Sequence, residues 1–104
     1  MSIVHRRVFF GKVGMAGRLV DYFKEGEKSM REGGFSLNSR ILTDSDSGRC
    51  DRVAVEWEAD DMGDLGKAFT SMMSQPGAQE SFQQWEAGLH EMIHYSEAET
   101  WQVR

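Results

Sequence analysis

A chain of 104 residues has room for one domain, which we expect to span residues 1–104 and to bury about two-thirds of the surface that the unfolded chain exposes. The composition is 39% hydrophobic and 28% charged with a single proline, which excludes disordered and fibrous proteins. Seventeen acidic residues against twelve basic ones give a net charge of −5, and no basic stripe interrupts it, so we expect no nucleic-acid partner.

The cysteine content and the absence of long apolar runs indicate the compartment. Cys50 is the only cysteine and cannot form an intramolecular disulfide, which favours a reducing environment. Residues 1–13 lack the apolar core of a signal peptide, and no apolar run is long enough to cross a membrane. We therefore expect a cytoplasmic protein without a membrane partner.

Residues 2–13, SIVHRRVFFGKV, predict a strand because they are rich in valine and phenylalanine. Alternation divides this strand into two faces, Val4, Val8 and Phe10 on one and Ile3, His5, Arg7 and Phe9 on the other. Apolar residues then recur at helical intervals from Met15 to Met30, until Gly33 and Gly34 interrupt the pattern. The spacing predicts an amphipathic helix.

Residues 35–43 and 51–59 both alternate between apolar and polar side chains and predict two strands joined by the loop DSDSGRC. Asp44, Asp46 and Gly48 resemble the start of a calcium-binding loop. The match fails, because the glycine is fifth rather than sixth and Val55 stands where a bidentate glutamate is needed. We therefore expect an ordinary hairpin loop.

Two helices and a strand complete the chain. Asp60 and Asp61 can cap a helix that ends near Pro76, a second helix follows from Ala78 to about His94, and residues 94–104 alternate again. The predicted order is β-α-β-β-α-α-β. This order predicts an α+β, ferredoxin-like fold, in which helices cover one face of a four-stranded antiparallel sheet.

The stretch His90-Glu91-Met92-Ile93-His94 contains H-E-x-x-H, the pattern by which a helical turn presents two histidines to zinc. On a helical wheel, both histidines point about 110° to 150° away from the centre of the apolar stripe. Few carboxylates remain downstream to complete a site, and the helix is expected to end near His94. We expect no metal site, and a zinc-dependent hydrolase is kept as a remote alternative.

The second face of the sheet is neither apolar enough for a core nor polar enough for plain surface. Helices can cover only one side of the sheet, so we predict that the mixed face packs against a second copy of the chain. The candidate interface residues are Arg7, Phe9, Arg40, Ala54 and Glu56. We expect the charges of Arg7, Arg40 and Glu56 to pair across the two-fold axis.

Between sheet and helices, aromatic residues and a methionine can converge on a ligand pocket. The candidates are Phe10, Tyr22, Phe23, Trp57, Phe69, Met73 and Trp85. The alternative is that these side chains only fill the core, as aromatic and methionine residues at helical spacing usually do. No general base is found beside them, so the catalytic residues stay unassigned.

Four segments carry a family resemblance: VFFGKV, RVAVEWEADDMGDLGKAF, SMMSQPGAQESFQQW and SEAETWQVR. With these segments the chain resembles the dimeric α/β-barrel superfamily, which includes antibiotic-biosynthesis-monooxygenase-like and NIPSNAP-like domains. The resemblance implies a homodimer of ferredoxin-like subunits. The chemistry of the superfamily is diverse, so the fold does not select a reaction.

The haem-degrading branch of the superfamily provides a specific comparison. Trp57 matches its tryptophan, but the first strand has no asparagine and the helix from Asp61 to Ser74 has no histidine. We therefore expect no haem and no other cofactor. Two functions stay open. The protein binds or oxidises a small, mostly apolar aromatic molecule, or it is a non-catalytic homodimeric module without a ligand.

Overall fold

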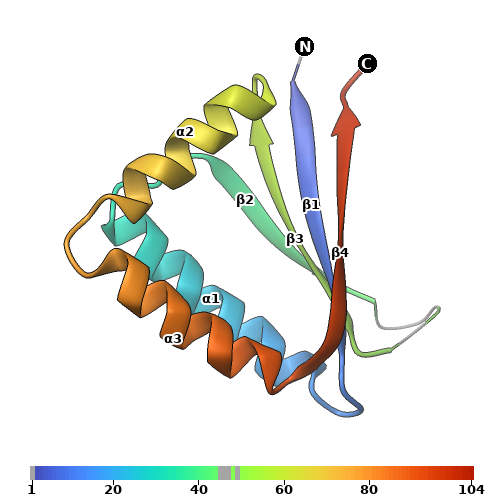
Figure 1. The fold of residues 1–104 in the computed structure, drawn as a ribbon. Helices are drawn as coiled ribbons and strands as arrows, with labels where there is room; N and C mark the ends of the chain where they lie inside the picture. Colours follow the sequence, from blue (N-terminus) through green and yellow to red (C-terminus); the bar gives the residue numbers. More distant parts are fainter. Residues whose placement is uncertain (1, 45–47, 49) are drawn as a thin grey trace.

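The computed structural model describes residues 2–44, 48 and 50–104, and Figure 1 shows the elements they form. In chain order these are β1 (Ile3–Gly11), α1 (Ala16–Glu32), β2 (Asn38–Thr43), β3 (Arg52–Ala59), α2 (Met62–Met73), α3 (Ala78–His90) and β4 (Ile93–Gln102). This is the predicted α+β, ferredoxin-like order.

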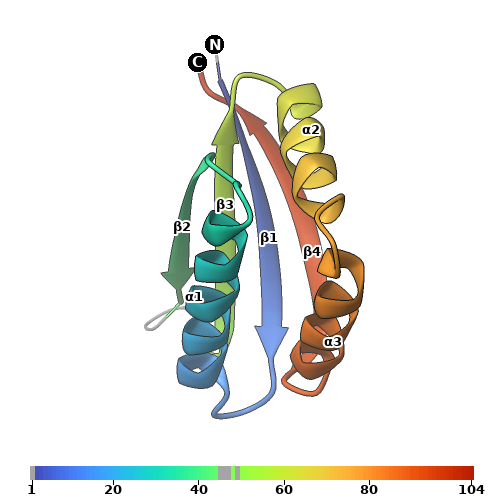
Figure 2. The same ribbon diagram turned by 90° about the vertical axis from the view of Figure 1, so that its left-hand side faces the viewer.

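The four strands form one antiparallel sheet in the order β2-β3-β1-β4. All three helices lie on one side of it, and within one chain the sheet is open rather than closed into a barrel (Figure 1). Viewed onto the helices, α1 lies in front of β2 and β3, while α2 and α3 lie toward β4 (Figure 2). The ribbon of β1 therefore runs behind the seam between the helices.

The ends of the helices follow from local chemistry. The Asp61 carboxylate accepts a hydrogen bond of 2.8 Å from the backbone N–H of Asp64, which caps α2 as predicted. Gly34, with φ of 97°, turns the chain after α1. The third helix ends at His90, earlier than expected, and β2 begins at Asn38 rather than at residue 35. Phe35 instead packs in the core between α1 and β2.

The two faces of β1 have the predicted members, but the prediction of which face points toward the helices is wrong. The pocket and interface candidates place Phe10 toward the helices and Arg7 and Phe9 away from them, whereas the structure has the reverse. In the register between β1 and β3, Phe9 lies opposite Val53 and Arg7 lies opposite Val55, and opposite residues in an antiparallel pair share a face. The side of the sheet toward the helices, here called the inner face, therefore carries Ile3, His5, Arg7 and Phe9. Because β1 has apolar residues in both phases, alternation alone does not select one.

The other side of the sheet, here called the open face, has no helix on it. Its residues are Val4, Arg6, Val8 and Phe10 from β1; Asn38, Arg40 and Leu42 from β2; Arg52, Ala54, Glu56 and Glu58 from β3; and Tyr95, Glu97, Glu99 and Trp101 from β4. This is the mixed face that the sequence predicts, except that β1 contributes its even-numbered residues.

The core forms where the inner face meets the helices. One cluster joins Phe9, Val53 and Val55 of the sheet to Leu19 and Phe23 of α1. A second cluster, of Phe35, Ala59 and Leu65, lies toward α2. The core therefore sits mainly over β1 and β3, the two central strands.

No helix in the described part of the chain is long and apolar enough to cross a membrane. The loop DSDSGRC, which we expect to be an ordinary hairpin loop, falls partly on residues 45–47 and 49, which lie outside the described residues. Within this loop, Cys50 is exposed.

The close packing around Gly11, the last residue of β1, gives a stability prediction. A methyl group on Gly11 would lie 2.6 Å from the Asp51 carbonyl oxygen and 2.7 Å from Leu19 Cδ1, whereas Gly66, exposed within α2, has open space around it. We predict that Gly11→Ala lowers the free energy of unfolding by about 1–3 kcal/mol. Gly66→Ala should raise it by up to about 1 kcal/mol. Urea unfolding measures both, and a Gly11→Ala variant as stable as the wild type would contradict this packing.

Candidate functional site

A cavity of about 60 Å³ lies between the inner face and the helices. The sheet contributes Phe9, Ser39, Ile41, Val55 and Trp57 to its wall; α1 contributes Phe23, Gly26, Glu27 and Met30; Phe35 and Trp85 complete it. Its lining is almost wholly apolar. Such a wall with a few polar groups at its edge is typical of sites for small molecules.

Three of the predicted pocket residues, Phe23, Trp57 and Trp85, line this cavity. Tyr22 lies behind it, stacked on Trp85 at 5.3 Å between ring centroids, and its hydroxyl donates a hydrogen bond of 2.6 Å to the Trp85 carbonyl oxygen. Tyr22 therefore positions the indole of Trp85 rather than facing a ligand.

The other predicted pocket residues lie elsewhere. Phe10 is on the open face, where its ring stacks on Tyr95 at 4.4 Å, so its assignment to the pocket is wrong. Phe69 packs edge-on against Trp57 at 5.4 Å in the second core cluster. Met73 and Phe69 border a shallow, open groove beside the turn into α3.

Polar side chains on the inner face of β1 and β4 border the apolar wall. His5 stacks on Trp57 at 6.1 Å, and its Nδ1 lies 2.9 Å from the hydroxyl oxygen of Thr100. Arg7 follows on the same face, with its guanidinium carbon 5.6 Å from the centre of the Phe9 ring. Sequence reasoning missed this group because it placed His5 and Arg7 on the opposite face.

The surroundings of His5 favour its neutral form. Burial lowers its pKa, and the positive charge of Arg7 lowers it further. A neutral imidazole can donate a hydrogen bond from one ring nitrogen and accept one at the other. His5 is therefore a candidate proton acceptor or hydrogen-bond partner for a molecule bound against Trp57.

The H-E-x-x-H stretch does not lie on one helical turn. His90 is the last residue of α3, whereas His94 belongs to β4. Both are exposed, and the chain reverses between them. Among the described residues, no group of three or more histidine, cysteine, aspartate or glutamate side chains is arranged to hold a metal ion.

The predicted interface residues divide between the two faces. Arg7 and Phe9 lie on the inner face, so they are not on the surface left open, whereas Arg40, Ala54 and Glu56 are. Glu56 is only 3% exposed although no helix covers it. Phe9 is instead part of the core, with its ring 4.7 Å from that of Phe23.

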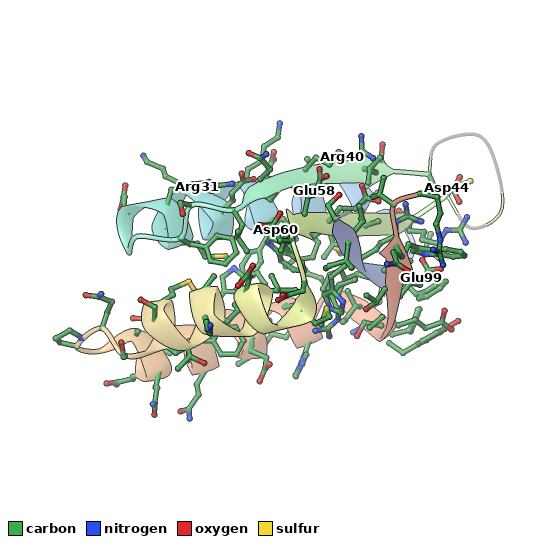
Figure 3. All side chains as sticks on the ribbon, turned by 90° about the horizontal axis from the view of Figure 1, so that it is seen from above. Arg31, Arg40, Asp44, Glu58, Asp60 and Glu99 are labelled. Carbon is green, nitrogen blue, oxygen red and sulfur yellow. The ribbon has the colours of Figure 1, made fainter. Side chains whose placement is uncertain are left out.

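Glu56 is buried by two arginines of its own chain. Arg6 and Arg40 each donate from Nε to one oxygen of the Glu56 carboxylate, both at 2.6 Å, and Arg6 also approaches Glu99 at 3.5 Å. Figure 3 shows the two outer members of this network, Arg40 on β2 and Glu99 on β4. Arg7 lies on the inner face, so it is not placed to pair with Glu56 across a two-fold axis at the open face, as was expected. Within the chain, Arg6 is the β1 arginine that pairs with Glu56.

The hydrogen bonds decide the charge of Glu56. Burial alone would raise the pKa of its carboxyl, but the hydrogen bonds from Arg40 and Arg6 outweigh burial and lower it. The carboxylate is therefore ionised at neutral pH. It contributes stability above the ordinary pKa of glutamate, and this contribution is lost as the pH falls through the lowered value.

Apolar side chains flank the charged centre of the open face. Trp101 is 57% exposed and Tyr95 is 45% exposed, and both come from β4, while Leu42 is exposed on β2 at the far edge of the sheet. Exposed tyrosine and tryptophan are enriched on surfaces that bind another protein.

The neighbourhood of His5 gives a pH prediction. Because Arg7 is the second cause of the lowered His5 pKa, Arg7→Gln should raise that pKa part of the way toward its ordinary value. Burial should keep it below that value. NMR titration of the imidazole protons measures the change, with Arg18→Gln, on the exposed side of α1, as control. An unchanged His5 pKa in Arg7→Gln would contradict the geometry.

Solved structures share this fold across nearly the whole chain. An uncharacterized NIPSNAP domain protein from Burkholderia xenovorans is 15% identical, with 98% of this chain and 94% of that chain covered at a TM-score of 0.77. A variant of SnoaB, a cofactor-independent oxygenase from Streptomyces nogalater, is 16% identical, with 99% and 93% covered at a TM-score of 0.68. A putative antibiotic biosynthesis monooxygenase from Bacteroides thetaiotaomicron is 18% identical, with 98% and 89% covered at a TM-score of 0.67.

No protein-family model matches the sequence, and neither does any curated protein. Identities of this size carry the fold and leave the reaction open. The chain has the ferredoxin-like fold shared by NIPSNAP-domain and antibiotic-biosynthesis-monooxygenase-like proteins, as its resemblance to that superfamily predicts.

Proposed function

We propose that this protein binds a small, planar aromatic molecule between the inner face and the helices. The observation that carries the proposal is the wall of five aromatic rings, which come from both layers and line an apolar cavity: Phe9, Phe23, Phe35, Trp57 and Trp85. Offset or edge-on stacking against such rings favours a planar ligand. His5, on the same face, supplies a polar group at the border.

The size of the cavity bears on how the ligand enters. About 60 Å³ is smaller than the cavity of about 150 Å³ that admits benzene in an apolar protein core. A ring therefore requires lining side chains to move. Met30 is the lining residue best suited to this, because its unbranched side chain repacks at low cost.

The comparisons support a small-molecule function through shared fold alone. SnoaB is a cofactor-independent oxygenase, so its fold can hold an oxidisable molecule without a bound metal or flavin. For the present chain we extend the proposal to oxidation as a second step. Oxygen consumption in the presence of a bound aromatic compound tests that step separately from binding.

The proposed assembly is a homodimer that packs through the open face. Trp101, Tyr95 and Leu42 offer apolar contacts on both edges of the sheet, and the central Glu56 already has its charge balanced within its own chain. In an isologous interface both subunits use the same surface, so the open face of one chain would pack against the open face of the other. The proposed compartment is the cytoplasm, where the exposed Cys50 stays reduced.

The alternative function is a non-catalytic homodimeric module. The small volume of the cavity favours it, as do the mutual contacts of the rings, for example Phe9 with Phe23 at 4.7 Å. In that case the aromatic residues serve packing, and only the open face has a partner. The two functions share the dimer and differ in the ligand.

The ligand proposal predicts a stabilisation that depends on Trp57. 2-Naphthol, a neutral planar probe, should raise the melting temperature more as its concentration increases. At a hundredfold excess over the dissociation constant, the free energy of unfolding should increase by about 2.7 kcal/mol. Trp57→Leu should lose this shift. Trp101→Leu, on the opposite face, should keep it, with each variant compared to its own ligand-free melting temperature. If no planar aromatic compound shifts the wild type, the module is the better account.

The dimer proposal predicts a mass of twice 11.8 kDa by light scattering at micromolar concentration. Trp101→Glu places a charge among the apolar contacts of the open face and should shift the protein toward the monomer. Phe82→Glu is the matched control, because Phe82 is an exposed aromatic residue on α3, away from the sheet. A monomeric wild type would overturn the proposal, and dissociation by Phe82→Glu alone would place the interface elsewhere.

A further inference from the structure

The arginines of the sheet differ in how their charge is balanced. Arg6 and Arg40 share Glu56, and Arg52 pairs with Asp44. Arg7 is the exception among the four. In the described part of the chain, no carboxylate lies within ion-pair distance of its guanidinium.

Arg7 is also the sheet arginine that points toward the helices. It stands on β1 between His5 and Phe9, opposite Val55 on β3 and Ala98 on β4. Its Nε is buried and has no hydrogen-bond partner among the described residues. The side-chain hydrogen bond that it makes to these residues is long, 3.4 Å from a terminal nitrogen to the Ser96 hydroxyl oxygen.

A guanidinium in this position is costly unless something binds it. A charge partly removed from water without a counter-charge loses hydration that a single long hydrogen bond does not replace. One residue earlier on the same strand, the charge of Arg6 is balanced by ion pairs with Glu56 and Glu99. The inner face offers Arg7 no such partner from within the chain.

We infer that Arg7 anchors an ionised oxygen of the ligand, so that the molecule bound between sheet and helices is a planar aromatic carboxylate. The inference rests on the proposed function and names its ligand class. The aromatic part lies against Phe9 and Trp57, which line the cavity; on the inner face Phe9 is two residues from Arg7 along β1, and Trp57 lies opposite His5. The carboxylate takes the open donors of the guanidinium fork, whose geometry suits two oxygens.

The neighbours of Arg7 fit this arrangement. The guanidinium lies near the Phe9 ring, at 5.6 Å, so an aromatic surface and the positive charge already adjoin. His5 is held by Trp57 and Thr100, and a neutral imidazole adds a hydrogen bond without competing for the anion as a second charge. On β4 the small residue Ala98 lies opposite Arg7, and Ser96 lies opposite Phe9.

The test compares two probes of equal shape and different charge. Calorimetric titration near pH 7.5 uses 2-naphthoate and its neutral amide, 2-naphthamide. The wild type should bind 2-naphthoate at least about tenfold more tightly, as expected for hydrogen bonds to a charged group. Arg7→Gln should remove that preference, because it weakens 2-naphthoate binding far more than 2-naphthamide binding. Arg7→Lys should retain part of it, and the exposed Arg18→Gln should behave as the wild type.

Stability separates an anchoring role from a structural one. Arg7→Met keeps the length of the side chain and removes the unbalanced charge, so the ligand-free melting temperature should stay unchanged or rise. This variant also serves for binding if Arg7→Gln does not fold. A clear fall in the melting temperature of ligand-free Arg7→Met would assign Arg7 to the fold and overturn the inference.

The outcomes distinguish this inference from the proposed function. Equal binding of the two probes by the wild type, or a preference that persists in Arg7→Gln, overturns the role of Arg7 and leaves aromatic binding in place. Binding of neither probe overturns both. Loss of the preference in Arg7→Gln, with 2-naphthamide still bound, supports both.

Discussion

The register between β1 and β3 is the constraint on which the rest of the structure depends. It sets Phe9 beside Val53 and Arg7 beside Val55, so the odd-numbered side chains of β1 face the helices. A shift by one residue would exchange the faces of the whole strand. It would expose Phe9, bury Phe10 under the helices and turn Arg6 away from Glu56. The buried Phe9 and the Arg6–Glu56 ion pair therefore support the same register from opposite sides of the sheet.

Arg6 and Arg7 show two opposite uses of one residue type. Arg6 lies on the open face and neutralises the buried Glu56 together with Arg40, so that face stays charged without unbalanced charge at its centre. Arg7 lies on the inner face beside the Phe9 ring, and no carboxylate of the described residues forms an ion pair with it. The first arrangement stabilises the sheet, and Trp101 and Leu42 remain exposed on either side of it. The second leaves the buried Nε of Arg7 without a hydrogen-bond partner among the described residues.

The sequence allowed the element order and most helix ends to be predicted, because helical spacing, the Asp61 cap and the glycines after α1 are local signals. The sequence did not allow us to predict which face of β1 points toward the helices. Val4, Val8 and Phe10 alternate with Ile3 and Phe9, so both faces look apolar. That single ambiguity explains why Phe10 was assigned to the pocket, and why Arg7 and Phe9 were assigned to the interface. Phe23, Trp57 and Trp85 do lie in the cavity wall, and their own elements have one clear apolar phase.

The register is tested most directly by two double-mutant cycles measured as free energies of unfolding. One combines Arg6→Met with Glu56→Gln, and the other combines Arg7→Met with Glu56→Gln. The register predicts that Arg6 and Glu56 are coupled by more than about 0.5 kcal/mol, while Arg7 and Glu56 are additive within that margin. Coupling of Arg7 with Glu56, and additivity of Arg6 with Glu56, would contradict it and with it the placement of both faces.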